Sequence, residues 1–218
     1  MKILLFDSGL GLIPSFNYLL KNKYNHDYYI EMEENFFPFG NKSEEDLVDF
    51  TILKLKKWEQ ENYDLIYIVC NTISVILKTK IAKISSKIRL ILNINEILVD
   101  KYNSSVLGTK ITCNYFKNKN KEVVDGSHLV RLIEERKIEK LILEIKKLEF
   151  KNHYVVLGCT HFSHILFLLK IYHPNITFID GYHLLFLDLI KGSKLSCTFN
   201  NKAKNKTNLF FFSHNNLI

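Results

Sequence analysis

The hydrophobic positions of this chain fall into short runs that alternate with longer amphipathic stretches. The runs are rich in Ile, Leu and Val, which is typical of strands buried on both faces of a parallel sheet. Between them, apolar residues recur at helical spacing, as expected of crossover helices that cover a sheet. The pattern therefore predicts an α/β fold with mainly parallel strands. We expect strands at 2–6, 27–31, 64–69, 89–94, 104–108, 121–124, 153–158, 175–179 and 208–213.

Two of the predicted helices carry apolar stripes. Ser43 stands three residues before Asp46, a capping-box pattern that predicts the start of a helix. We expect both stripes to lie in the core, because the other positions of these helices are mainly charged. An Asn- and Lys-rich cluster at 200–206 predicts an exposed loop before the last strand. The stripes comprise Leu47, Thr51, Leu55 and Trp58 in the first helix, and Ile138, Leu141, Ile142, Ile145 and Leu148 in the second.

The composition is that of a globular protein and excludes a disordered, collagen-like or coiled-coil chain. The 218 residues are 47% hydrophobic and 24% charged, an ordinary balance for a chain that can bury a large core. The formal net charge is +7, but only three of the 30 basic residues are arginines. Specific nucleic-acid recognition depends on the bidentate guanidinium group. We therefore expect the lysines to cover solvated helix faces, and we expect no nucleic-acid partner.

Cysteine usage and the amino-terminal residues indicate a cytoplasmic protein. The four cysteines, at 70, 113, 159 and 197, form no CxxC pair, which fits a reducing compartment. Asp7 interrupts the first apolar run, so this run is too short for a signal peptide. No window has the uninterrupted apolar length that a membrane span requires. We expect a soluble protein that does not bind a membrane.

Two segments far apart in the chain share a layout. Residues 65–77 are LIYIVCNTISVIL, and residues 154–166 are YVVLGCTHFSHIL. In each segment an apolar strand ends at a cysteine, a serine follows four residues later, and an Ile-Leu pair comes next. The alignment places Cys70 on Cys159 and Ser74 on Ser163. It predicts a duplicated strand-cysteine-helix unit, although two Ile- and Leu-rich units could also match by chance.

The predicted positions of Cys70 and Cys159 suggest a shared chemistry. Both would follow the carboxyl ends of strands, where ligands bind in open α/β sheets. Each would also stand at the amino end of a helix, where unpaired N–H groups and the helix dipole favour a thiolate or bind a carboxylate. Asn71, Thr72 and Thr160 add polar side chains at these turns. Two such thiols could remove a proton from one face of a carbon and deliver one to the other, which inverts a stereocentre.

Other interpretations of these residues stay open. A free cysteine often packs as a small apolar side chain, which is our interpretation of Cys113 and Cys197. Cys159 and His161 lack the second ligand pair that a zinc site requires, so we expect no metal. A single cysteine nucleophile with a histidine base would leave Cys70 without a role. The chain also lacks a glycine-rich phosphate-binding motif that would suit pyridoxal phosphate.

Several motifs follow one another in a characteristic order. The chain contains FDSGLG at 6–11, PFGNKS at 38–43, VCNT at 69–72, LVRLIEE at 129–135, GCTH at 158–161 and FFFSH near the end. In this order they resemble the glutamate racemase family, the cofactor-independent enzymes of the aspartate/glutamate racemase superfamily. GCTH in particular favours the glutamate branch over the aspartate racemases. The resemblance runs from one end of the chain to the other.

The resemblance implies an architecture and an activity. It implies two pseudo-symmetric α/β lobes, formed by 1–93 with 196–218 and by 94–195, and an active site in the cleft between them. It implies interconversion of L- and D-glutamate for peptidoglycan synthesis, in the cytoplasm and without a cofactor. We also expect the chain to form a homodimer.

The resemblance also implies roles for individual residues. Cys70 and Cys159 would be the two acid/base thiols, with Asp7 assisting Cys70 and with Glu134 and His161 assisting Cys159. From the residues alone, Asp7 could instead cap its loop and His161 could cap its helix. The substrate would be bound by Ser8, Phe39, Gly40, Asn71, Thr72, Thr109, Thr112 and Thr160.

The chain departs from the family pattern at several points. Leu12 and Phe39 stand where glycine and tyrosine are usual, and EMEEN at 31–35 lacks the usual Asp-Thr pair. The region between the two cysteine motifs is also short. Loss of the tyrosine hydroxyl predicts weaker substrate binding. These departures leave two alternatives open: a catalytically silent relative that binds an acidic amino acid or a protein partner, and a racemase for aspartate.

Overall fold

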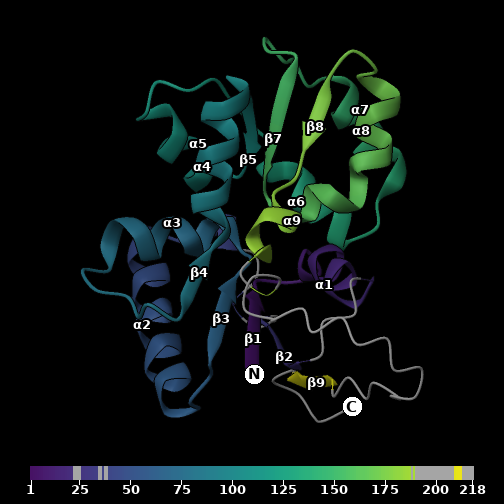
Figure 1. Cartoon of the computed structure of the whole chain (residues 1–218). Helices are drawn as coiled ribbons and strands as arrows, with labels where there is room; N and C mark the ends of the chain where they lie inside the picture. The colour runs from purple at the N-terminus through teal and green to yellow at the C-terminus, as the bar shows by residue number, and fades with distance from the viewer. Residues whose placement is uncertain (22–25, 34–35, 37–38, 188, 190–208, 213–218) are drawn as a thin grey trace.

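The computed structural model describes residues 1–21, 26–33, 36, 39–187, 189 and 209–212, and its strands form two parallel sheets (Figure 1). The first sheet has the order β4-β3-β1-β2-β9 and is built from β1 (Lys2–Asp7), β2 (Asp27–Met32), β3 (Leu65–Ile68), β4 (Ile88–Leu90) and β9 (Leu209–Phe212). The second has the order β6-β5-β7-β8, with β5 (Ser105–Gly108), β6 (Val123–Asp125), β7 (Tyr154–Gly158) and β8 (Thr177–Ile179). The predicted α/β fold with mainly parallel strands is confirmed.

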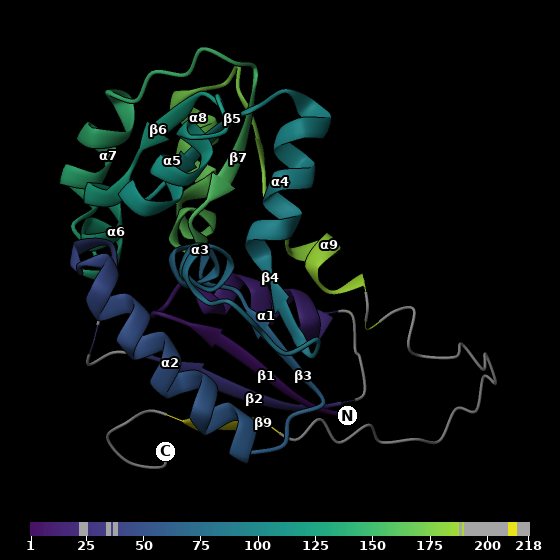
Figure 2. The same ribbon diagram turned by 90° about the vertical axis from the view of Figure 1, so that its left-hand side faces the viewer.

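Helices connect and cover the strands. The first sheet carries α1 (Leu12–Lys21), α2 (Glu44–Gln60) and α3 (Asn71–Lys80), and we call this unit the first lobe. The second lobe is the second sheet with α5 (Lys110–Lys117), α6 (Ser127–Glu134), α7 (Ile138–Lys146) and α8 (Leu166–Tyr172). The two lobes lie one above the other, joined by α4 (Ile91–Tyr102) (Figures 1 and 2). The structure also describes α9 (Tyr182–Leu185) and two 3-10 turns, η1 (Phe39–Asn41) and η2 (Thr160–Ile165).

Strand β1 shows how the sequence builds the core of the first lobe. Its successive side chains point to opposite faces of the sheet, and all are buried from Ile3 to Asp7. Ile3 and Leu5 belong to the apolar cluster that includes α1, whereas Leu4 and Phe6 pack with α2 and α3. The first sheet is therefore covered on both faces, with α1 and α2 on opposite sides (Figure 2).

Helix α2 begins as the sequence predicts. The Ser43 hydroxyl accepts a hydrogen bond from the Asp46 backbone N–H at 3.1 Å, and it donates to the Asp46 carboxylate at 2.7 Å. Leu47, Thr51 and Trp58 are buried, and Leu55 packs against the same cluster. The predicted stripe is confirmed at these positions.

One predicted strand boundary and one predicted core position are wrong. The strand expected at 89–94 ends at Leu90, and α4 starts at Ile91. The apolar run at this point suits a buried helix as well as a strand, and the buried residues of α4 follow helical spacing. Ile138, expected in the core, is 53% exposed because it is the first residue of α7. Leu141 and Ile145 of that stripe are buried as predicted.

Packing continues from one lobe into the other. Helix α4 contributes Leu92, Leu98 and Val99 to a cluster that also includes Val106 and Val156 of the second sheet. Helix α9, which follows the second sheet in the chain, packs back against α1 and α4. Within the described residues, no helix combines the length and apolarity needed to cross a membrane. The predicted loop at 200–206 and Cys197 lie outside the described residues.

Candidate active site

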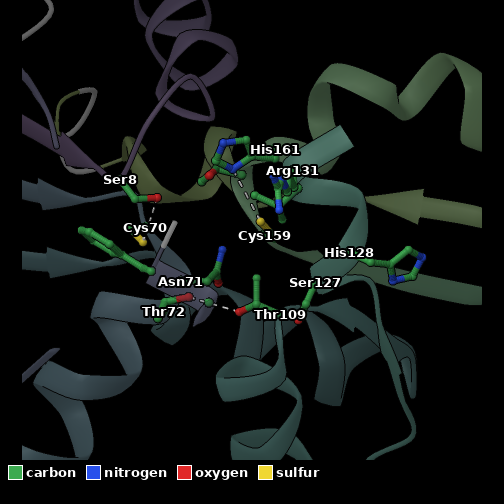
Figure 3. Close-up of a pocket in the computed structure, with 14 residues that line it drawn as sticks. Ser8, Cys70, Asn71, Thr72, Thr109, Ser127, His128, Arg131, Cys159 and His161 are labelled. Atoms are coloured by element: carbon green, nitrogen blue, oxygen red, sulfur yellow. Dashed lines mark hydrogen bonds between the residues drawn. The ribbon is translucent and has the colours of Figure 1, made fainter. Parts of the chain in front are cut away.

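A cavity of about 330 Å³ lies between the two lobes, at the carboxyl ends of strands from both sheets (Figure 3). In the first sheet Phe6 pairs with Ile68, so Ser8 and Cys70 follow neighbouring strand ends. In the second sheet Gly108 pairs with Gly158, so the same is true of Thr109 and Cys159. Ser8, Cys70, Thr109 and Cys159 all line the cavity. The parallel register of each sheet therefore determines which side chains meet there.

The two cysteines occupy equivalent positions in their lobes. Cys70 is the N-cap residue of α3, and Cys159 is the N-cap residue of η2. Both side chains line the cavity, although the residues are only 4% and 8% exposed. The predicted strand-cysteine-helix repeat is thus present in both lobes, with one difference. The second unit continues as a 3-10 turn before α8 begins at Leu166.

Cys70 is surrounded by Ser8 and Asp7. Its sulfur lies 3.8 Å from the Ser8 hydroxyl. The Ser8 backbone N–H donates to Asp7 Oδ1 at 2.7 Å, which fixes the fully buried carboxyl group. Burial raises the pKa of Asp7, and nearby His161 offsets only part of this effect. The carboxyl group of Asp7 therefore binds a proton more readily than an exposed one.

The amino end of α3 favours a thiolate at Cys70, as expected, but burial and Asp7 outweigh this effect. Burial raises the pKa of Cys70 well above its usual value, and the negative charge of Asp7 adds to this increase. The Ile73 backbone N–H lowers the pKa, but by less. Desolvation disfavours the charged form of any buried acid, and a neighbouring carboxylate adds repulsion. Cys70 is accordingly a protonated thiol in this structure.

Cys159 faces a histidine-glutamate pair. Its sulfur lies 3.8 Å from His161 Nδ1, and His161 Nε2 is 2.5 Å from Glu134 Oε1. Burial lowers the pKa of His161, but hydrogen bonds to Cys159 and Glu134 outweigh burial and raise it to about 10. Burial raises the pKa of Glu134, but the hydrogen bond to His161 outweighs it and lowers the pKa. The pair is therefore an imidazolium and a carboxylate, and it places a positive charge beside the Cys159 sulfur.

Polar side chains form the remaining wall of the cavity. Thr72 Oγ1 of the first lobe lies 3.1 Å from Thr109 Oγ1 of the second, a hydrogen bond between the lobes. Asn71 Oδ1 accepts from Asn95 Nδ2 at 2.7 Å, which turns the Asn71 amide nitrogen toward the space between the cysteines (Figure 3). These hydroxyl and amide groups can bind the carboxylates and the ammonium of an amino acid.

Most of the residues predicted for the site lie together. Asp7 and Glu134 lie behind the lining and contact it through Ser8 and His161. Thr112 is buried and reaches the cavity only through Thr109, 3.4 Å away between hydroxyl oxygens. The predicted residues that line the cavity are Ser8, Phe39, Gly40, Cys70, Asn71, Thr72, Thr109, Cys159, Thr160 and His161.

One wall of the cavity was missed by the sequence analysis. Ser127, His128, Val130 and Arg131 of α6 also line it. Together with Glu134 they occupy one face of the helix, at offsets of zero, one, three, four and seven residues. This helical spacing was readable in the sequence once Glu134 had been assigned to the site.

The arrangement suits proton transfer at a small polar molecule. Thiol groups from two lobes line a single cavity, one beside a carboxyl group and the other beside an imidazolium. Across the described residues, no cluster of three or more His, Cys, Asp or Glu side chains could hold a metal ion. The thiols and the imidazolium of the lining can act as acid and base groups.

Sequence comparisons find related proteins over most of the chain. No family model matches it. A glutamate racemase of Helicobacter pylori (strain Shi470) is 32% identical over 185 residues, which are 74% of this chain and 72% of that protein. A glutamate racemase of Buchnera aphidicola from Schizaphis graminum is 31% identical over 208 residues, covering 82% of this chain and 79% of the relative.

Solved structures share the fold. Glutamate racemase of Campylobacter jejuni superposes with a TM-score of 0.77 at 21% identity, covering 99% of this chain and 93% of that one. An aspartate racemase of Picrophilus torridus is more distant, with a TM-score of 0.61 at 17% identity over 88% of this chain and 94% of that one. The fold and the relatives together define an amino-acid racemase. The chain belongs to the glutamate racemase family.

Proposed function

We propose that this protein interconverts L- and D-glutamate by proton exchange between Cys70 and Cys159. The observation that carries the proposal is the presence of two equivalent cysteines, one from each lobe, in the lining of one cavity. Removal and delivery of a proton on opposite faces of a carbon requires two such groups. The scheme needs neither a metal nor an organic cofactor.

The different surroundings of the cysteines set the first direction of the reaction. The Cys159 thiolate removes the α-proton, forming an S–H bond, and the electron pair of the broken C–H bond is delocalised into the α-carboxylate. The Cys70 thiol then delivers its proton to the opposite face of the carbon. Cys159 ends as a thiol and Cys70 as a thiolate, and the configuration of the amino acid is inverted. After the product leaves, exchange of protons with solvent restores the Cys159 thiolate and the Cys70 thiol, and D-glutamate reacts by the same steps in the reverse order.

Neighbouring groups balance these charges. Burial raises the pKa of Asp7, so its carboxyl group takes up a proton more readily than an exposed one, and in its neutral form it no longer repels a Cys70 thiolate. The Glu134–His161 pair plays the corresponding role beside Cys159, because its imidazolium stabilises the thiolate before proton removal. Both assisting groups are held by hydrogen bonds within the fold and need not move far.

We assign binding of the substrate to the polar lining. In this assignment Ser8, Asn71, Thr72, Thr109 and Thr160 supply donors and acceptors, Gly40 contributes backbone groups, and Thr112 orients Thr109. Phe39 provides an apolar wall, with its ring packed 5.2 Å from that of Phe50. A dicarboxylic amino acid with one ammonium group fits this mixture of donors and acceptors.

The wider role follows from the same proposal. Production of D-glutamate would supply peptidoglycan synthesis in the cytoplasm. The homodimer and the limits of the two lobes at 93/94 and 195/196 stay predictions. A dimer would be detected directly by the mass of the protein in solution.

The function can be tested with purified wild-type protein. We expect the optical rotation of L-glutamate to decay to zero and D-glutamate to give the same endpoint, because both enantiomers reach one equilibrium. Aspartate, offered under the same conditions, should react much more slowly. Folded protein that racemises neither enantiomer of glutamate would contradict the proposal, and faster racemisation of aspartate would change the substrate. If bound glutamate slowed alkylation of the two thiols but was not racemised, the protein would bind glutamate without acting on it.

A further inference from the structure

His164 lies outside the lining of the cavity but contacts the first lobe. It is exposed, and its Nε2 lies 2.7 Å from the backbone carbonyl oxygen of Leu10. A carbonyl oxygen only accepts hydrogen bonds, so Nε2 is the donor. The contact links η2 of the second lobe to the turn that precedes α1 in the first lobe.

The same turn is held by the Glu134–His161 pair. The Leu10 backbone N–H donates to Glu134 Oε1 at 3.2 Å, and this oxygen also binds His161 Nε2. Both backbone groups of Leu10 are thus bound by side chains of the second lobe. His161 and His164 stand three residues apart in a 3-10 turn, where side chains at this spacing lie on the same face.

The position of this turn matters for both cysteines. Asp7 and Ser8, which surround Cys70, lead directly into it. At Gly11 it approaches the second lobe so closely that a Cβ atom would lie 2.1 Å from Thr160 Oγ1 and 2.9 Å from Asp7 Oδ2. A displacement of the turn would therefore alter the surroundings of Cys70 and of the residue that follows Cys159.

We propose that His164 is a positioning residue that latches the Ser8–Gly11 turn of the first lobe onto the second lobe. Through Leu10 it holds Ser8 beside Cys70 and keeps Glu134 in register with His161. On the opposite side of the cavity, Thr72 and Thr109 make the corresponding link between the lobes. The inference rests on the proposed racemase function, since its kinetic consequence is the alignment of two acid/base groups.

The test compares two substitutions at His164 with a matched control. His164→Leu removes the donor from the second lobe and leaves the Leu10 carbonyl only its bond from the Ile13 backbone N–H, whereas His164→Gln retains a side-chain N–H group that can reach this carbonyl. His173 is the control, because its Nε2 lies 2.8 Å from the Ile145 carbonyl oxygen, a bond of the same kind within the second lobe. All three variants are prepared in the full chain and assayed well below their unfolding temperatures.

We expect His164→Leu to lower kcat for glutamate about fivefold, the effect of one net hydrogen bond, with a smaller change in KM. His164→Gln should recover most of the loss, and His173→Leu should leave kcat within about twofold of wild type. When Glu134→Ala has already removed the other anchor of Leu10, His164→Leu should cost less than it does alone. An unchanged kcat in His164→Leu, an equal loss in His173→Leu, or no rescue by glutamine would overturn the proposal.

Amide hydrogen exchange separates failure of the latch from failure of the proposed function. In His164→Leu the Leu10 and Gly11 amides should exchange faster than in wild type, whether or not the protein racemises glutamate. Unaltered exchange at these amides would overturn the latch. If wild-type protein shows no racemisation while the exchange still responds to His164→Leu, the latch stands as a structural contact and the kinetic role fails with the proposed function.

Discussion

Cys70 and Cys159 follow equivalent strands in the two lobes, yet the charges around them are opposite. Cys70 lies beside the buried carboxyl group of Asp7. Burial and the charge of Asp7 both raise the pKa of Cys70. Cys159 lies beside the imidazolium of His161, whose own pKa is raised to about 10. The repeated unit therefore supplies the positions of the thiols, and residues outside the repeat supply their difference. In the proposed scheme this difference decides which thiol starts deprotonated and which starts protonated.

The largest effect is expected from removal of either thiol. Cys70→Ser and Cys159→Ser should each lower kcat for racemisation by at least about 10³-fold, because each removes one of two essential acid/base groups. The measurement is the decay of optical rotation with either enantiomer of glutamate. If either variant retained the wild-type rate, the two-thiol scheme would be wrong.

Cys113 is the matched control for these substitutions. It is also buried in the second lobe, but its sulfur donates to the Val124 carbonyl oxygen at 3.4 Å, away from the cavity lining. Burial raises the pKa of Cys113 to about 12, so its thiol stays protonated. Cys113→Ser should therefore leave the rate of racemisation unchanged.

The second prediction concerns the buried ion pairs of the first lobe, next to the strand that ends at Asp7. Lys54 Nζ lies 2.7 Å from both Glu31 and Glu33, and the Glu33 backbone N–H donates to the Asp7 carbonyl oxygen. Lys54→Met should lower the free energy of unfolding by about 3 kcal/mol, because two buried carboxylates lose their shared cation. Urea denaturation measures this loss. Lys57→Met, at a side chain that is 41% exposed, should cost less than about 1 kcal/mol.

The pH dependence of this loss has a defined sign. Burial raises the pKa of Glu31, but Lys54 and Trp58 outweigh burial and lower it in the folded protein. In wild type this contributes stability above the ordinary pKa of a glutamate, and the contribution disappears as the pH falls through the lowered value. The deficit of Lys54→Met should therefore shrink in acid. A deficit that is independent of pH would show that Lys54 acts through packing alone.

The third prediction concerns the Glu134–His161 pair beside Cys159. Glu134→Gln removes the charge and weakens the hydrogen bond that raises the pKa of His161, so this pKa should fall. The imidazolium is then lost at a lower pH than in wild type, and kcat/KM should fall about 10- to 100-fold. Nuclear magnetic resonance of the His161 ring measures the pKa directly. Glu122→Gln is the control, since Glu122 pairs with Lys151 and neither residue lines the cavity.

The smallest effect is expected at the hydroxyl pair that joins the lobes. Thr72→Val removes the hydrogen bond to Thr109 and should raise KM for glutamate about fivefold or less, with little change in kcat. Thr79→Val is the control, because the Thr79 hydroxyl bonds only its own helix, at the Val75 carbonyl oxygen. Equal effects of the two substitutions would mean that Thr72 acts on helix α3 and not on the substrate.

Much of the fold followed from local patterns. Apolar runs of Ile, Leu and Val identified the strands, and Ser43 with Asp46 identified the start of α2. The exception at 89–94 arose because a short apolar run carries no period that separates a buried strand from a buried helix. Ile138 shows a second limit, since a stripe does not indicate how far its first residue extends beyond the core.

The site was predictable only where residues belonged to a motif. Cys70 and Cys159 stood out by their repeat, and both line the cavity. The opposite charges beside them could not be predicted, because they depend on burial and on contacts between residues distant in sequence, such as Glu134 with Leu10. Arg131 and its neighbours on α6 form no motif of their own, so the sequence did not predict their place in the lining.

Hydrogen isotope transfer tests the two-thiol account most directly. Each enantiomer of glutamate is incubated with wild-type protein in D₂O, and the α-position of substrate and product is analysed after a small fraction has reacted. The account predicts deuterium in the newly formed enantiomer and protium in the remaining substrate, because the thiol that delivers the proton exchanges with solvent beforehand. Product that retains the substrate's protium, or remaining substrate that gains deuterium as fast as product forms, would show that a single group performs both transfers.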